Sequence, residues 1–203
     1  MAGWEADLYF KKRIVYAINR QHFVFDAAEL LFSTHSVDSG TQFLLRYLLP
    51  AVRQPARILD LGCGYGVIGI VLARFHPQAH VTMSDKDLLA VRYTQHNAEL
   101  NNVPNTTTLA SIGTDDLPPG TFDLIVSNVP GHIGDAAIVR DFVLKPIERL
   151  SEGGAYWIVV VTPLVELIER TAQEHNLTYQ PIAQHPQHRV YRFDKLGDQP
   201  PDQ

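Results

Sequence analysis

The chain has 203 residues, of which 45% are hydrophobic and 19% are charged, and its formal net charge is −5. This length suits one domain with a full hydrophobic core, and the acidic balance is unlike that of proteins that hold long nucleic acid through charge. No apolar run is long enough to span a membrane, the N-terminus does not resemble a secretory signal, and a single cysteine excludes an internal disulfide, so we expect a cytoplasmic protein without membrane contact.

Residues 1–50 predict a small extension that packs on the main fold. A weak amphipathic pattern predicts a helix over 4–18. Two apolar runs at 22–25 and 30–32, separated by a polar turn at 26–29, predict a β-hairpin.

The end of this extension predicts a second helix over 39–50, with Ser39 as its N-cap and Pro50 near its end. The one local cluster of cations lies near the N-terminus, at Lys11, Lys12, Arg13 and Arg20. Such a cluster forms either a basic patch or, more simply, a solvated helix face.

From residue 51 onward, short apolar strands alternate with longer amphipathic segments. Strands are predicted at 57–61, 80–84, 106–110, 122–127 and 155–161, and helices at 66–75, 86–101, 136–150 and 163–175. This alternation is typical of parallel strands joined by crossover helices on both faces of a sheet.

Two final strands, 177–183 and 189–193, are too close for a crossover and predict an antiparallel hairpin with its turn at 185–188. We therefore expect an α/β fold with a doubly wound, mostly parallel, seven-stranded Rossmann-like sheet over residues 51–195. Residues 196–203 predict a disordered tail.

The strongest motif is the glycine loop Asp60-Leu-Gly62-Cys63-Gly64-Tyr-Gly66, between a predicted strand and a predicted helix. Glycines allow the backbone to turn sharply and approach a ligand, and the loop lies where doubly wound folds bind cofactors. Gly64, Gly66 and Gly69 also satisfy the dinucleotide pattern G-x-G-x-x-G. An acidic Asp60 would oppose a pyrophosphate but suits the amino group of a methionine moiety, which favours a methyl donor over a dinucleotide.

Asp85 ends the second predicted strand, where a carboxylate can accept hydrogen bonds from both hydroxyls of a ribose. Either Asp85 or Asp87 could instead cap the following helix; we assign the ribose to Asp85 and the cap to Asp87. Cys63 could act as a thiolate, but no histidine pairs with it in the sequence, and a space-filling side chain within the cofactor loop is the simpler interpretation.

Ser127-Asn128-Val129-Pro130-Gly131-His132 follows the fourth strand, next to the glycine loop in such a fold. The segment could be an ordinary turn. It could also hold an exocyclic amine, because the side-chain oxygen of Asn128 and the carbonyl of Val129 could accept both N–H groups and make the nitrogen lone pair more available.

These motifs resemble the class I S-adenosylmethionine-dependent methyltransferases that have the "small" methyltransferase domain. Within that class the chain is most similar to the ribosomal RNA (small subunit) guanine-N2 methyltransferases and their single-domain relatives. The segment Phe32-Ser-Thr-His-Ser-Val-Asp38-Ser-Gly40-Thr41 and the strand Arg189-Val-Tyr-Arg192 resemble the same family.

The resemblance implies S-adenosylmethionine as cofactor, ribosomal RNA as partner, and Asn128, Val129 and Pro130 as the catalytic segment. It implies His132 and Phe32 at the substrate. The full set of implied cofactor-binding residues is Asp60, Gly62, Cys63, Gly64, Gly66, Asp85, Lys86, Ser111, Ile112, Asn128, Gly40 and Thr41.

The chain also departs from the family pattern. Val129 replaces a proline, and Gly131 replaces a bulky residue that is expected to pack against a flipped base. His132 is a candidate to take over that contact, although a loop histidine is more often structural or solvated. Ser111, or the backbone beside it, stands where the family often has a side chain that reads the adenine amine.

Four functions therefore compete. The first is methylation of an exocyclic amine in RNA, guanine foremost, and the second is methylation of a small molecule or a protein glutamine. The third is a non-catalytic cofactor-binding module, and the fourth is a nucleotide-dependent oxidoreductase. We predict no metal site, because the histidines lack ligand spacing, and we favour a monomer.

Overall fold

The computed structural model describes residues 4, 7–31 and 35–195. It begins with an antiparallel hairpin of β1 (Phe10–Ile18) and β2 (Gln21–Ala28). The prediction of a helix over 4–18 is therefore wrong, and so is the hairpin predicted over 21–33. The turn lies at Asn19 and Arg20, whose φ angles of 46° and 64° suit a two-residue hairpin turn.

Side-chain alternation explains why β1 is a strand. Ile14 and Tyr16 pair with Phe25 and Phe23 across the hairpin, so these four side chains share one face. That face packs into the core with period two, which the weak helical pattern of 4–18 concealed. Phe32, expected at the substrate, lies outside the described residues.

Helix α1 (Ser39–Ala51) follows, close to its predicted range. Its N-cap is Asp38 and not Ser39 as predicted, because the Asp38 carboxylate accepts the Thr41 N–H at 2.9 Å. Pro50 lies inside the last turn. Since α1 continues to Ala51, it crosses the domain boundary predicted between residues 50 and 51.

The main sheet has seven strands in the order β5-β4-β3-β6-β7-β9-β8, which confirms the predicted doubly wound fold. The first five strands in this order are parallel, and β9 pairs antiparallel with both β7 and β8. The strands are β3 (Arg57–Leu61), β4 (His80–Asp85), β5 (Thr106–Ala110), β6 (Phe122–Asn128), β7 (Leu150–Val161), β8 (Tyr179–His185) and β9 (His188–Asp194).

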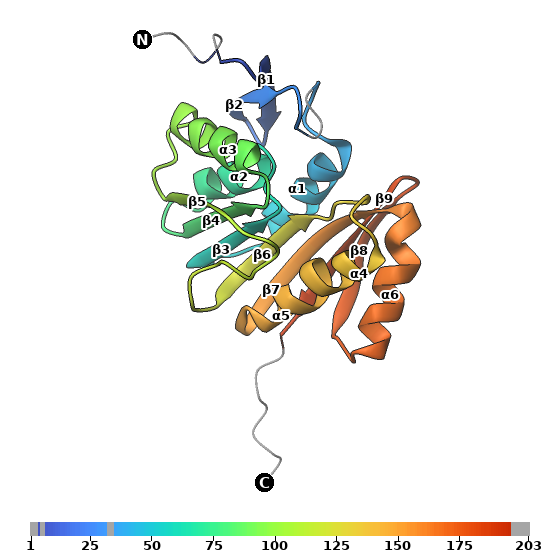
Figure 1. The fold of residues 1–203 in the computed structure, drawn as a ribbon. Helices are drawn as coiled ribbons and strands as arrows, with labels where there is room; N and C mark the ends of the chain where they lie inside the picture. Colours follow the sequence, from blue (N-terminus) through green and yellow to red (C-terminus); the bar gives the residue numbers. More distant parts are fainter. Residues whose placement is uncertain (1–3, 5–6, 32–34, 196–203) are drawn as a thin grey trace.

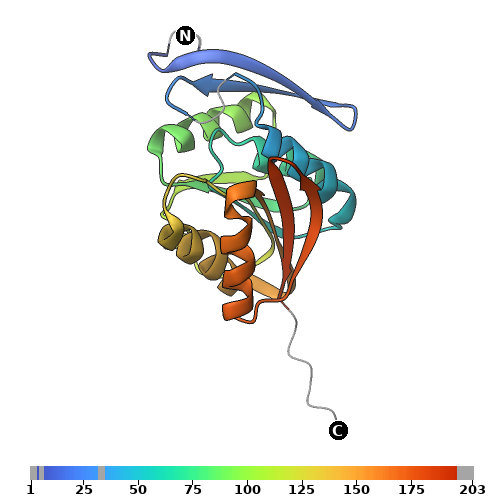
Figure 2. The same ribbon diagram turned by 90° about the vertical axis from the view of Figure 1, so that its right-hand side faces the viewer.

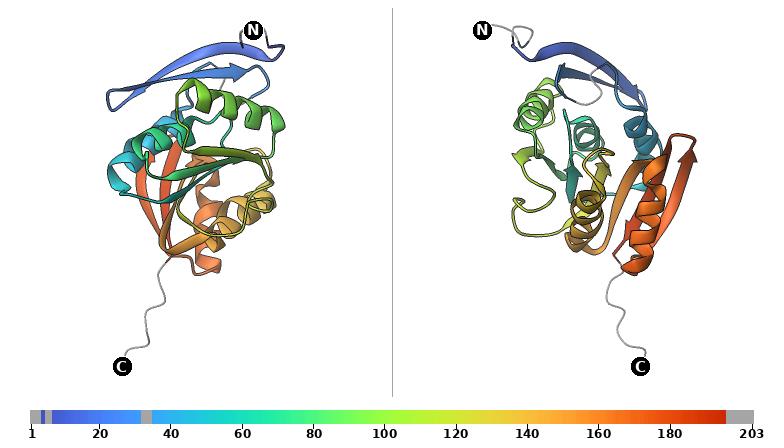
Figure 3. Two further views of the ribbon diagram at one scale, coloured as in Figure 1. Left: turned by 90° about the vertical axis from the view of Figure 1, so that its left-hand side faces the viewer. Right: turned by 45° about the vertical axis from the view of Figure 1, so that its right-hand side comes forward.

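Helices cover both faces of this sheet (Figures 1 and 2). One face carries α1, α2 (Val67–Phe75) and α3 (Leu88–Leu100), and the other carries α4 (Asp135–Ala137), α5 (Lys145–Glu148) and α6 (Val165–Glu174). Each face has its own buried cluster, and the cluster on the α1–α3 side also includes Phe23 and Phe25 of the hairpin. The hairpin thus lies over that helical layer (Figure 3).

Two asparagines, one in α3 and one at its C-cap, join the hairpin to the sheet domain. Asn97 accepts the Asp26 N–H and donates to the Asp26 carbonyl, and Asn101 does the same with Val24. One turn apart on the helix, their amides pair with alternate residues of β2 as a neighbouring strand would. Asp26, which the sequence placed in a turn, is fully buried at this junction.

The segment predicted as one helix over 136–150 is irregular. A π-helical stretch, Ile138–Leu144, separates α4 from α5, and β7 begins at Leu150 rather than at 155. A 3-10 turn at Thr162–Leu164 precedes α6. None of the helices formed by the described residues is long and apolar enough to cross a membrane. The predicted disordered tail, 196–203, lies outside the described residues.

Candidate functional site

The site predicted from the sequence lies at the carboxyl ends of the central strands. The chain winds outward from β3 to β4 and β5 in one direction and from β6 to β7 in the other. The point where the direction reverses, between β3 and β6, is where open α/β sheets bind ligands. The glycine loop follows β3, and Asn128 ends β6, so the two main motifs flank this point.

The glycine loop has the left-handed backbone that favours glycine. Gly62, Gly64 and Gly66 have φ angles of 71°, 57° and 93°. The Ser84 carbonyl at the end of β4 accepts the N–H groups of Gly62 at 2.8 Å and Cys63 at 3.0 Å, which fixes the start of the loop. A side chain at Gly64 would meet open space, so the loop is accessible there.

Asp60 is completely buried beneath this loop. Its Oδ2 accepts the Gly69 N–H at 2.7 Å, which caps α2 from the preceding strand, and its Oδ1 has no partner among the described residues. Burial, helped by the nearby Asp85 charge, raises the pKa of Asp60 to about 7. A direct contact of Asp60 with a donor's amino group stays a prediction, and its burial favours support of the loop from below.

Gly69 explains why the helix can lie so close to Asp60. A methyl group at this position would come within 2.5 Å of the Met83 side chain. The third glycine of the G-x-G-x-x-G pattern therefore serves the packing of α2 on β4.

Asp85 is held ready at the end of β4. Its Oδ2 accepts the Gly64 N–H at 2.9 Å and its Oδ1 the Asp87 N–H at 3.0 Å. Partial burial raises the pKa of Asp85, and the exposed Lys86 opposes this shift. Each carboxylate oxygen keeps acceptor capacity for a ribose hydroxyl. Asp87 caps α3 through the Leu89 N–H at 2.8 Å, as predicted.

Cys63 fits the space-filling interpretation. Its side chain is buried, and its sulfur lies 3.6 Å from the Thr94 hydroxyl. Burial raises the pKa of the thiol, so no thiolate is favoured here. Thr94 also donates to the Gly64 carbonyl at 2.8 Å, a support for the loop that the sequence did not reveal.

The end of β5 contributes Ser111 and Ile112. The Ser111 hydroxyl donates to the Gly113 carbonyl and accepts the Asp116 N–H, so it is used within its own turn. The Ile112 side chain is 56% exposed and can contact an apolar ring face. It is therefore the better candidate of the two for a contact with the cofactor.

Asn128 is joined to the start of α1. Its Nδ2 donates to Asp38 Oδ2 at 2.7 Å and to the Thr41 hydroxyl at 3.1 Å. A carboxylate only accepts hydrogen bonds, so the Asp38 contact requires the NH₂ side of the amide and leaves Asn128 Oδ1 as the acceptor for another molecule. The sequence places Asp38 in a segment that resembles the family and just before a predicted helix, but it did not reveal this contact with Asn128.

Gly40, expected at the cofactor, lies in the same junction. A Cβ there would come within 2.9 Å of Asp38 Oδ2 and 3.0 Å of the His188 ring. Gly40 and Thr41 thus border the Asp38–Asn128 pair, and their contact with a cofactor stays a prediction.

The residues after Asn128 differ in exposure. Val129 is buried in the second core cluster and donates its N–H to the Val159 carbonyl at 3.0 Å, which a proline could not do. Pro130 is half-buried, and His132 is exposed. A Cβ at Gly131 would lie 3.3 Å from Val161, an apolar side chain that is 36% exposed.

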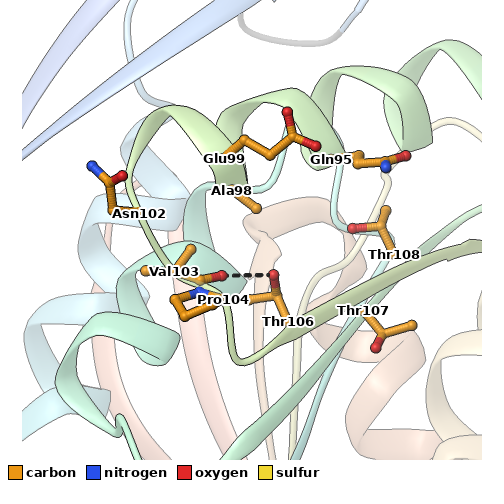
Figure 4. Close-up of a pocket in the computed structure, with 9 residues that line it drawn as sticks. All are labelled: Gln95, Ala98, Glu99, Asn102, Val103, Pro104, Thr106, Thr107 and Thr108. Carbon is orange, nitrogen blue, oxygen red and sulfur yellow. Dashed lines mark hydrogen bonds between the residues drawn. The ribbon is translucent and has the colours of Figure 1, made fainter.

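A cavity of about 760 Å³ lies away from this site (Figure 4). It is lined by the end of α3 and the start of β5, including Glu99, Asn102 and Thr106, whose hydroxyl donates to the Val103 carbonyl. The functional residues lie at the opposite, carboxyl ends of the strands. Within the described residues, no group of three or more His, Cys, Asp or Glu side chains is arranged to hold a metal ion.

Fold and site together define a doubly wound α/β domain with a glycine loop, a carboxylate and an asparagine at its switch point. The family described as "Methyltransferase small domain" matches residues 22–192, and the chain belongs to this family.

Similar proteins come from several bacteria. A ribosomal RNA small subunit methyltransferase C from Actinobacillus pleuropneumoniae is 34% identical over 156 residues, which cover 74% of this chain and 47% of the relative. A ribosomal RNA large subunit methyltransferase G from Stutzerimonas stutzeri is 36% identical over 134 residues, which cover 64% of this chain and 35% of the relative.

Among solved structures, the Thermus thermophilus 16S rRNA N2 G1207 methyltransferase, in complex with AdoMet and guanosine, superposes with a TM-score of 0.74 at 26% identity. The match covers 92% of this chain and 51% of that chain. The chain thus spans about half the length of the small-subunit relative and of the Thermus protein, and about a third of the large-subunit relative.

Proposed function

We propose that this protein is an S-adenosylmethionine-dependent methyltransferase that modifies an exocyclic amine of guanine in ribosomal RNA. The observation that carries the proposal is the orientation of Asn128. Asp38 binds its NH₂ group, so the free Oδ1 can accept a hydrogen bond from an N–H of the acceptor.

The described residues fit the proposed cofactor. The loop is open at Gly64, and Asp85 ends the neighbouring strand with spare acceptor capacity for two ribose hydroxyls. The exposed Ile112 offers an apolar contact for a purine ring. When bound, S-adenosylmethionine supplies an electrophilic methyl group on a sulfonium leaving group.

The chain's own residues orient the acceptor. An aromatic exocyclic amine is a poor nucleophile because its lone pair is conjugated with the ring. Hydrogen bonds from its two N–H groups to Asn128 Oδ1 and the Val129 carbonyl would hold the nitrogen in line with the methyl group and return electron density to it. The donor's methyl group would pass to this nitrogen with the sulfonium sulfur as leaving group, and an amine proton would leave to solvent.

The comparisons support this assignment. The relatives are named as methyltransferases of ribosomal RNA, and the solved Thermus structure holds AdoMet together with guanosine. RNA as the partner, the monomeric state and the cytoplasmic location remain predictions.

The loss of the family's bulky residue at Gly131 favours a second candidate, methylation of a small molecule or a protein glutamine. The structure offers a substitute, because the half-exposed Val161 lies against Gly131 and can supply apolar contact to a base. Val129 points into the core, so its side chain does not alter the acceptor site.

The test is transfer of label from methyl-labelled S-adenosylmethionine to unmodified small subunits, large subunits, naked RNA, and an RNA-free extract. We expect label in RNA that falls by about 10²–10³ in Asn128→Ala, the usual loss when a group that stabilises the transition state is removed. Label confined to the RNA-free extract would replace guanine with another acceptor. Donor binding without any transfer would indicate the non-catalytic module, and tight NADH binding would indicate the oxidoreductase.

A further inference from the structure

The N-terminal hairpin differs in charge from the rest of the molecule. Residues 10–28 contain Lys11, Lys12, Arg13 and Arg20 but only one acid, Asp26, which gives +3 in a chain whose net charge is −5. The remaining residues therefore sum to −8. Since residues 10–18 form a strand and not a helix, Lys11, Lys12 and Arg13 follow one another along an extended segment, and Arg20 lies in the turn after it.

Two of these cations, Lys12 and Arg13, have specific contacts. Arg13 forms a two-point ion pair with the fully buried Asp26, which His96 also contacts at 2.8 Å, so Asp26 anchors this part of β1 to α3. The hairpin register shifts between Phe10 and Lys12, which places a bulge at the exposed Lys11.

A groove of about 380 Å³ follows the outer edge of β1. One wall is β1 from Lys12 to Ala17, and the other is formed by His35, Ser36, Val37 and Gln42. Lys12 reaches across it, with Nζ 3.1 Å from the His35 carbonyl. Tyr16 lines the groove and is half-buried.

A further cation lies beside the groove on α1. Burial raises the pKa of Tyr16, and the nearby guanidinium of Arg46 opposes this shift. Arg46 follows Gln42 by one helical turn, and both are exposed. The groove is thus bordered by cations from two separate elements, β1 and α1.

One wall of the groove adjoins the acceptor site along the chain. Gln42 donates to the Val37 carbonyl, and Val37 immediately precedes Asp38, whose carboxylate binds Asn128. A strand lying in the groove would therefore reach the point where an amine meets Asn128 Oδ1. Figures 1 and 3 show the hairpin and the start of α1 on the same side of the molecule.

We propose that this groove binds the single-stranded RNA that flanks the target nucleotide, with Lys12 and Arg46 at its phosphates and Tyr16 against a base. The proposal rests on the function proposed above. A cationic groove with an aromatic side chain is the usual platform for single-stranded RNA, because phosphates need countercharge and every base can stack. The cavity at β5 has no such lining, since its one charged residue is Glu99.

Binding of a short single-stranded RNA, measured by fluorescence anisotropy over a range of salt concentrations, tests this proposal without any methyl transfer. The test variants are Lys12→Glu and Arg46→Glu. The matched control is Arg170→Glu, which makes the same charge change on α6, where Arg170 is 56% exposed on the other face of the sheet.

Each test variant should lose one phosphate contact, lowering the salt slope by about 0.7 and weakening binding about fivefold at roughly 0.1 M salt. Affinity for S-adenosylmethionine and thermal stability should match the wild type, and Arg170→Glu should bind RNA as the wild type does. Tyr16 should form a photo-crosslink to RNA.

Two results would overturn the groove assignment. One is that Lys12→Glu and Arg46→Glu bind RNA no more weakly than Arg170→Glu does, and the other is that the wild type does not bind RNA. These failures are distinct from failure of the proposed function. Methylation of RNA that is indifferent to Lys12 and Arg46 would refute the groove alone, whereas RNA binding through the groove without methyl transfer would refute the function alone.

Discussion

Exchange of the two side chains that meet at 2.7 Å, Asp38 and Asn128, gives the sharpest test of how the acceptor site is oriented. Asp38→Asn keeps an equally good N-cap for α1, so thermal stability should fall only by what the weaker contact with Asn128 costs. It replaces a charge-assisted hydrogen bond by a neutral one, which is weaker by about 1 kcal/mol, and it allows the Asn128 amide to turn. We expect kcat to fall about fivefold.

Asn128→Asp should be far worse. A carboxylate oxygen would then stand where Nδ2 lies, against Asp38 Oδ2, and two like charges about 4 Å apart repel by about 4 kcal/mol at an effective dielectric constant of about 20. The acceptor oxygen would be displaced, and kcat should fall by about 10²–10³.

The double variant Asp38→Asn/Asn128→Asp restores the pair with its partners exchanged. The amide at position 38 can donate to the carboxylate at 128, whose other oxygen can accept the substrate N–H. Because Asp38 Oδ2 also accepts the Thr41 N–H, an amide nitrogen in its place gives up that cap, and stability should fall by about 1 kcal/mol. Steady-state methyl transfer, with kcat and KM separated, should show at least about tenfold recovery over Asn128→Asp. Asp87→Asn, the same change at the N-cap of α3, controls for capping and should leave kcat unchanged. The reasoning is refuted if the double variant is no more active than Asn128→Asp.

Three further predictions concern stability, and urea denaturation measures each. Gly69→Ala should lower the free energy of unfolding by about 1–3 kcal/mol, because the new methyl group would meet Met83 at 2.5 Å. The same substitution should cost less when it is made in Met83→Ala. An equal cost in both backgrounds would contradict the packing argument. Asn97→Ala should lower the free energy of unfolding by about 3 kcal/mol, because it leaves the buried backbone N–H and carbonyl of Asp26 unpaired. Asn101→Ala should cost less, because its partner Val24 is only half-buried. Equal costs would argue against the pairing of α3 with β2. The pKa of Asp60 is raised to about 7 in the folded state, so between about pH 4 and pH 7 the folded protein binds a proton that the unfolded chain has lost. The stability of the wild type should therefore fall relative to that of Asp60→Asn as the pH rises from about 4 to 7, by up to about 4 kcal/mol. Parallel pH curves for the two proteins would show that Asp60 ionises normally.

The central fold could be predicted from the sequence because its middle strands are buried on both faces. Runs such as 57–61 and 122–127 are mostly apolar, and each is followed by a helix with its own start signal. The glycine loop and Asp85 could be placed for the same reason, since the end of a parallel strand determines where the next residues lie.

The N-terminal hairpin could not be predicted in this way. One edge of β1 is open and cationic, and β2 is completed by side chains of α3, residues 97 and 101, that are distant in sequence. Local periodicity over 4–18 therefore resembles a helix, and the apolar runs predict a hairpin whose first strand is in fact the second strand, β2.

The roles of Asp38 and Thr94 also depend on distant contacts. Asp38 meets Asn128 across 90 positions, and Thr94 meets the Gly64 carbonyl across 30. Thr94 has no local pattern that distinguishes it from an ordinary helix residue, and Asp38 stands in a segment that resembles the family but does not reveal its partner. Such supporting residues become visible only when the strands have brought their partners together.

The identity of the methylated atom tests the central claim most directly. Ribosomal RNA treated with the wild-type protein and S-adenosylmethionine would be digested to nucleosides and analysed by mass spectrometry, beside RNA treated with Asn128→Ala. If Asn128 Oδ1 accepts an N–H of the acceptor, the product is guanosine methylated on its exocyclic N2, and it is lost in the variant. Methylation of a ring carbon, a ring nitrogen or a ribose hydroxyl, or a product indifferent to Asn128, would contradict the account.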